Sequence, residues 1–78
     1  MNDWLSARAD ALAAAAGIER AELELSDEVE DRLLQLAGHV AHASGARTNA
    51  PLLCYLAGIA HARGASLEAL DETVRSTS

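Results

Sequence analysis

The sequence predicts an all-α protein, a compact bundle of three main helices with a short fourth helix at its C-terminal end. Two observations lead to this fold class. No β-branched or alternating stretch of strand length separates the breaks at Gly17, Ser26, 45–48 and 64–66. Ala and Leu, both strong helix formers, account for 18 and 12 of the 78 residues. A chain of this length forms one domain, which we assign to residues 1–78.

The first helix is predicted over residues 3–16. Asn2 or Asp3 is suited to cap it, because a short polar side chain accepts a free N–H group of the first turn. Gly17 is suited to end it in the left-handed conformation. Its buried side is expected to comprise Trp4, Leu5, Leu12, Ala15 and Ala16. Residues 18–25 then form a linker with helix-like spots.

The second helix is predicted over residues 27–44, with Ser26 as its N-cap. Acidic residues crowd its first turn, where they favour the positive end of the helix dipole. Apolar residues recur at the spacing of a core-facing stripe, namely Val29, Leu33, Leu36 and Val40.

The third and fourth helices are predicted over residues 51–63 and 67–75. Thr48 or Asn49 is expected to cap the third, Pro51 suits its first turn, and Gly64 stops it. One face of this helix is large and apolar, and the other is mostly small, so we expect a central helix with neighbours on both sides. The large apolar face consists of Leu52, Tyr55, Leu56 and Ile59. The mostly small face consists of Cys54, Ala57, Gly58 and His61. Ser66 caps the fourth helix, whose inward side is Leu67, Leu70 and Val74.

Composition excludes several classes of protein. The net charge is −6, from six Arg, no Lys and twelve acidic residues. Nucleic acids and anionic membranes require clustered positive charge, so we expect neither as a partner. A single Cys excludes an internal disulfide, and no apolar run approaches the roughly 20 residues that span a bilayer. The expected location is the cytoplasm.

Four side chains have residue types that bind zinc. His39 and His42 are three residues apart on the second predicted helix, and Cys54 and His61 are seven apart on the third. These residues can be explained without a metal. His42 is expected to be solvated, Cys54 to be inert on a packed face, and His61 to be favoured by the helix dipole. We therefore expect no metal centre and no cofactor, and keep these four residues as minor candidates.

Carboxylates gather where the linker meets the second helix. Acid–base catalysis would need burial or crowding that separates their pKa values, whereas these groups flank a helix start and are expected to face water. We interpret them as an interaction edge that orients a basic partner: Glu19, Glu22, Glu24, Asp27, Glu28, Glu30 and Asp31. No arrangement of nucleophile, base and anion cradle is present, so no catalytic residue is predicted.

Two segments resemble a known family. One is the opening 1–5, MNDWL, and the other combines 36–42, LAGHVAH, with 50–60, APLLCYLAGIA. They are similar to a small actinobacterial helical domain family of unknown function, found alone or fused to molybdenum-cofactor guanylyltransferase-like proteins. The loop 44–49 differs from the Arg- and Pro-rich loop of that family. The resemblance implies a pathway context and no reaction.

The sequence therefore predicts a non-enzymatic interaction module linked to molybdenum-cofactor or molybdoenzyme metabolism. Its partner would be a molybdenum-cofactor nucleotidyltransferase or a molybdoenzyme. One alternative is a small metal- or ligand-binding domain that uses the His and Cys side chains, and another is a self-associating structural domain, for example a homodimer. Four residues are assigned architectural roles: Trp4 and Tyr55 as core anchors, Pro51 as a helix start, and Gly58 as a point of close helix approach.

Overall fold

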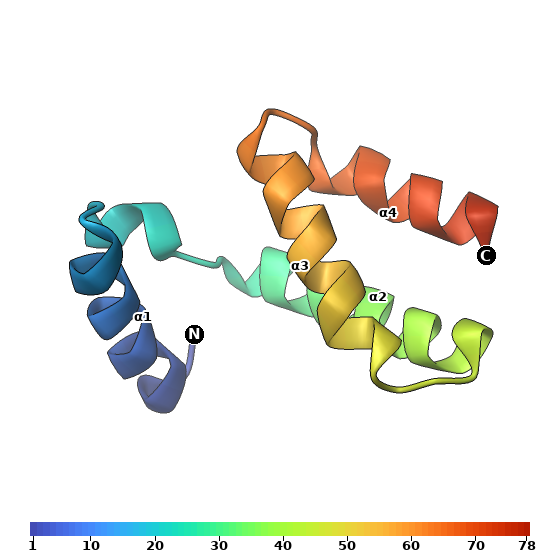
Figure 1. Ribbon diagram of the computed structural model, residues 1–78, viewed down its shortest axis with the longest axis horizontal. Coiled ribbons are helices and arrows are strands. Elements are labelled where there is room, and N and C mark those ends of the chain that lie inside the picture. The colour runs from blue at the N-terminus through green and yellow to red at the C-terminus, as the bar shows by residue number, and fades with distance from the viewer. The chain divides into compact units, whose positions relative to one another are not determined.

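The computed structural model describes residues 1–78 and contains helices only (Figure 1). They are α1 (Asp3–Ala16), the 3-10 helix η1 (Arg20–Leu23), α2 (Asp27–Ser44), α3 (Asn49–Ala62) and α4 (Leu67–Thr77). The all-α fold class with a short fourth helix is thus confirmed. No helix has the length and apolar character needed to cross a membrane. The chain divides into two structural units, Met1–Asp31 and Arg32–Ser78, and the assignment of one domain stays a prediction.

In Met1–Asp31, local chemistry sets both ends of α1. The Asn2 side chain accepts a hydrogen bond from the Leu5 N–H at 2.8 Å. At the other end Gly17 has φ 68°, and Ile18 N–H bonds to the Ala13 carbonyl while Gly17 N–H bonds to that of Ala14. This is a Schellman motif, which uses two carbonyl groups that the helix leaves free. The predicted bounds of α1 are correct.

The inner side of α1 is made of small residues. Ala9 and Ala13 are buried, and α1 contacts η1, which occupies part of the segment expected to be a linker. Arg20 joins the two elements: its Nε donates to Asp10 Oδ1 at 2.7 Å, and its Nη1 donates to Glu24 Oε1 at 2.8 Å. The guanidinium also bonds to the Leu23 carbonyl at 3.1 Å, so one side chain fastens η1 to α1.

The expected buried side of α1 is largely wrong within this unit. Trp4 is 67% exposed and Leu12 is 62% exposed, and Ala15 and Ala16 are exposed too, whereas Leu5 is half-buried. The Arg8 guanidinium lies 4.8 Å from the centre of the Trp4 ring, a cation–π contact at the surface. Small alanine side chains let η1 approach the helix closely, and the larger side chains are left on its other faces. The role of Trp4 as a core anchor stays a prediction.

In Arg32–Ser78, consecutive helices reverse direction, so that α3 runs back from the end of α2 and α4 returns from the end of α3 (Figure 1). Leu36 and Val40 of α2 and Ala50 and Ala57 of α3 are the buried residues of this unit. Leu33 of α2 is half-buried. The inward residues expected for α4 are half-buried too, namely Leu67, Leu70 and Val74. These burials confirm the predicted stripes of both helices.

The caps of α2, α3 and α4 follow the sequence closely. Ser66 accepts from Ala69 N–H at 3.1 Å, and Ser26, which precedes α2, accepts from Val29 N–H at 3.2 Å. Both are the predicted N-caps. Thr48 is the N-cap of α3 without a side-chain hydrogen bond, and α3 begins two residues before Pro51. A Pro at the third position is compatible with this start, because first-turn N–H groups have no partner within the helix.

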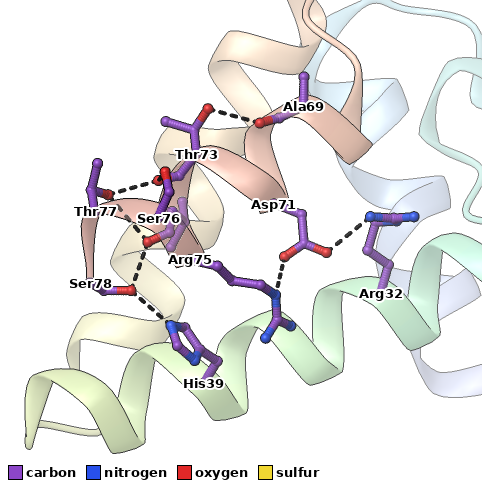
Figure 2. Close-up of polar contacts among 10 residues, drawn as sticks. Arg32, His39, Ala69, Asp71, Thr73, Arg75, Ser76, Thr77 and Ser78 are labelled. Carbon is purple, nitrogen blue, oxygen red and sulfur yellow. Dashed lines mark hydrogen bonds and ion pairs between the residues drawn. The ribbon is translucent and has the colours of Figure 1, made fainter.

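Polar contacts fasten α4 to α2 (Figure 2). Asp71 accepts from Arg32 Nη1 at 2.9 Å and from Arg75 Nε at 2.6 Å, and its side chain is only 15% exposed. At the end of α4 the Ser78 hydroxyl donates to the Val74 carbonyl at 2.7 Å, and it also lies 2.8 Å from His39 Nε2. Since the hydroxyl has one proton, it accepts from His39, which places a proton on Nε2. With these contacts α4 extends to Thr77, two residues beyond its predicted end at residue 75.

We expect Asp71→Asn to lower the free energy of unfolding by about 1 kcal/mol, because it weakens two charge-assisted hydrogen bonds at a poorly exposed carboxylate. Urea unfolding followed by circular dichroism measures the change. Glu72→Gln is the matched control, since Glu72 is exposed and forms no ion pair. Equal effects of the two substitutions would contradict the role of Asp71.

We expect Gly17→Ala to destabilise the protein by about 1 kcal/mol, because an L-residue at φ 68° is strained. A Cβ atom there would meet nothing within 4 Å, so no steric clash contributes. Gly38→Ala is the control, because Gly38 is inside α2 and equally free of neighbours. It should stabilise the protein by about 0.5–1 kcal/mol through helix propensity. A stabilising Gly17→Ala would contradict the Schellman ending.

Candidate functional site

The four minor metal candidates all lie in Arg32–Ser78, where they have separate environments. His39 bonds to Ser78, His42 is exposed, and His61 donates through Nδ1 to the Ala65 carbonyl at 2.7 Å. No group of three or more His, Cys, Asp or Glu side chains is arranged to hold a metal ion. The structure therefore does not assemble these residues into a metal site.

Cys54 is half-buried on the inner side of α3. Burial raises the pKa of the Cys54 thiol above its ordinary value, because the apolar surroundings disfavour the thiolate. A thiol with a raised pKa is a poor nucleophile and a poor metal ligand at neutral pH. The environment agrees with the expected inert cysteine on a packed face.

The interaction edge lies in Met1–Asp31, and some of its carboxylates have local partners. Glu24 pairs with Arg20, Glu30 Oε2 lies 3.1 Å from the amino group of Met1, and Glu22 accepts from the Glu19 N–H at 3.2 Å. The others are exposed without an ion pair: Glu19, Asp27, Glu28 and Asp31. The edge thus presents free negative charge to solvent at the end of the linker and the start of α2.

Most of the exposed large apolar residues of Arg32–Ser78 lie on the outer side of α3. Leu52, Tyr55 and Leu56 are 61–72% exposed and Ile59 is 44% exposed. We call these four residues the α3 face. Their spacing of three, four and seven residues places them along one side of the helix. An exposed leucine is ordinary by itself, whereas a stripe of four large apolar side chains is uncommon on the exposed side of a helix.

Within Arg32–Ser78 only one side of α3 has a neighbour, and the expectation of neighbours on both sides stays a prediction. Only its small side is covered within the unit, where Ala50 and Ala57 are buried and Leu53, Cys54 and Ala60 are half-buried. Tyr55 is not a core anchor there, since it is 72% exposed. Gly58 is also exposed, and a Cβ atom at this position would meet nothing within 4 Å. No helix of Arg32–Ser78 approaches Gly58 closely, and the predicted close approach stays a prediction.

The comparison with known proteins gives one family. A family described as Domain of unknown function (DUF6457) matches residues 1–78, the whole chain. The chain belongs to the DUF6457 family. No curated protein and no solved structure matches it. The resemblance implied a family of unknown function, and this is confirmed. The actinobacterial origin and the molybdenum-cofactor fusions stay predictions.

Sequence reasoning grouped the residues of the α3 face but did not recognise the face as exposed in this DUF6457 chain. A signal was present, because Asn49–Ala62 contains no Asp, Glu, Lys or Arg. A helix that is apolar on all sides is either enclosed by its own chain or covered by something else. Periodicity does not distinguish these cases.

We expect the Cys54 thiol to react slowly with iodoacetamide at pH 7, at least tenfold more slowly than glutathione, because its raised pKa and half-burial reduce accessible thiolate. The rate should rise as the pH approaches the pKa, and should match that of glutathione in 8 M urea. Mass spectrometry of the alkylated protein over time measures both. Rapid alkylation of the folded protein at pH 7 would contradict the assignment.

Proposed function

We propose that this DUF6457 chain is a non-enzymatic protein-interaction module whose docking surface is the α3 face. The observation that supports this is the exposure of Leu52, Tyr55, Leu56 and Ile59 along one side of an uncharged helix. Large aliphatic and aromatic side chains at helical spacing are the anchors by which helices bind partner surfaces. Docking would remove this apolar surface from water, which stabilises the complex by about 25 cal/mol for each Å² buried.

The acidic interaction edge has a separate role in the proposal. Exposed carboxylates such as Asp27, Glu28 and Asp31 steer a basic region of the partner during encounter, and contribute more to association rate and orientation than to final affinity. The α3 face supplies the affinity. The interaction edge therefore acts over longer range and the α3 face acts on contact.

The biological context of the proposal comes from the family resemblance of the sequence. We propose an accessory protein or small subunit of molybdenum-cofactor or molybdoenzyme metabolism, located in the cytoplasm. The partner would be a molybdenum-cofactor nucleotidyltransferase or a molybdoenzyme. The location of the docking surface and this pathway assignment are separate claims, so different readouts test them.

Site-specific photocrosslinking in the native cell tests the docking surface. A photoreactive residue introduced as Tyr55→p-benzoylphenylalanine should give a discrete crosslinked species, because the side chain lies within the proposed contact. The control is Leu34→p-benzoylphenylalanine, since Leu34 is 72% exposed on α2, outside the α3 face. Equal crosslinking at both positions, or none at Tyr55, would contradict the proposal. Mass spectrometry of the species then tests the pathway, and a species containing two copies of the chain would favour the self-associating alternative.

We expect Leu56→Asp to weaken binding of the captured partner by at least tenfold, as substitution of a central apolar contact does. Leu34→Asp should change it by less than twofold. Both side chains are more than half exposed, at 61% and 72%, so neither substitution should unfold the helix. Isothermal titration calorimetry measures binding, and circular dichroism checks folding. Equal binding by the two variants would exclude the α3 face as the surface.

A further inference from the structure

We propose that α4 is a releasable strap, which opens about Ser66 and uncovers the inner side of α2 while α2 and α3 stay helical. This device is independent of the α3 face, because it concerns the covered side of the unit Arg32–Ser78. The closed state is the one in the structure. The open state exposes additional apolar surface, so α4 controls access to the inner side of α2.

Of the three helices in this unit, α4 contributes least to the core. It has no buried residue, whereas α2 and α3 have two each. Those residues are Leu36, Val40, Ala50 and Ala57. The inward residues of α4 are only half-buried. Because local stability depends on buried apolar contacts, α4 is the helix of this unit that detaches at the lowest cost in free energy.

The side of α2 that faces α4 contains the most deeply buried side chain of the protein. Arg32 and His39 of α2 bond to Asp71 and Ser78 of α4, so this side of α2 faces α4 (Figure 2). Leu36 follows Arg32 by four residues and precedes His39 by three, which places all three on one side of the helix. The Leu36 residue is 2% exposed. Release of α4 would therefore uncover apolar surface at Leu36.

Polar bonds fasten α4 to α2 at two points in one register. Arg32 donates to Asp71 at 2.9 Å, and seven residues further along both helices His39 donates to Ser78 at 2.8 Å. Both pairs are separated by 39 residues, so the two helices run parallel. Partly exposed polar contacts of this kind contribute little net stability, because water competes for both partners. Contacts that break and form again thus hold the strap closed.

The connection between α3 and α4 places the hinge at Ser66. Ala65 stays with α3, because its N–H bonds to the Ala60 carbonyl at 3.2 Å and its carbonyl accepts from His61 Nδ1 at 2.7 Å. Ser66 is exposed, has an extended backbone and is the N-cap of α4. Rotation about Ser66 releases α4 without disturbing the end of α3. Once released, a helix of 11 residues is marginal in water, so its backbone amides exchange with solvent.

Native-state hydrogen exchange of the full chain, followed by NMR at low urea concentrations, tests the strap. The backbone amides of 70–77 should be at least tenfold less protected than those of 36–40. Their exchange should also depend little on urea, because a local opening exposes little surface. Equal protection of the two segments with one common urea dependence would overturn the inference, since α4 would then leave only when the whole unit unfolds.

A matched pair of substitutions tests the fastening. Asp71→Asn should speed the exchange of the α4 amides by about fivefold, because it weakens the bond to Arg32. Glu72→Gln should change it by less than twofold, since Glu72 is exposed and forms no ion pair. Equal effects of the two substitutions would contradict the role of Asp71 in closing the strap.

A buried thiol tests whether the opening uncovers the inner side of α2. Val40 follows Leu36 by four residues and is 8% exposed. Val40→Cys is introduced together with Cys54→Ser, so that the chain has a single thiol, and circular dichroism checks its folding. The thiol should react with iodoacetamide through the same opening equilibrium as the α4 amides, within about threefold. Labelling only through global unfolding, as measured by the amides of 36–40, would overturn the strap as a cover of α2.

Discussion

The use of small side chains on the inner faces of α1 and α3 determines the rest of this structure. In Met1–Asp31 the buried residues of α1 are Ala9 and Ala13, and in Arg32–Ser78 those of α3 are Ala50 and Ala57. Alanine allows close approach of a neighbouring element but buries little apolar area. Burial of apolar surface stabilises a fold by about 25 cal/mol per Å², so each buried alanine contributes little to the stability of its unit. The large apolar residues of α1 and α3 are left on the outer sides, where they do not stabilise their own unit.

Charged contacts fasten the peripheral elements that the small inner faces hold weakly. Arg20 attaches η1 to α1 by pairing with Asp10, and Asp71 attaches α4 to α2 by pairing with Arg32. Each such pair contributes up to about 1 kcal/mol when it is partly exposed. A small domain has little stability in reserve, and a partner that binds only the folded state adds to it. Binding to the α3 face would thus both form a complex and stabilise the bound unit.

Much of the local structure is predictable from the sequence because caps depend on neighbouring residues alone. Asn2, Ser26 and Ser66 accept the hydrogen bonds expected of N-caps, and Gly17 and Gly64 have φ of 68° and 112° at helix ends. The inward stripe of α2 is equally clear, since its other sides are mostly polar or small, apart from Leu34. The inner face of α3 is not predictable in this way. Both of its sides are apolar, so hydrophobic periodicity does not show which side the chain itself covers.

The same reasoning explains why the candidate site was only partly predictable. The acidic interaction edge is visible in the sequence, because charge does not depend on tertiary structure. Recognising the α3 face requires knowing that Ala50 and Ala57 are the buried residues, which only the structure gives. The stripe of Leu52, Tyr55, Leu56 and Ile59, which its own unit leaves exposed, favours non-specific association. The net charge of −6 opposes such association between copies.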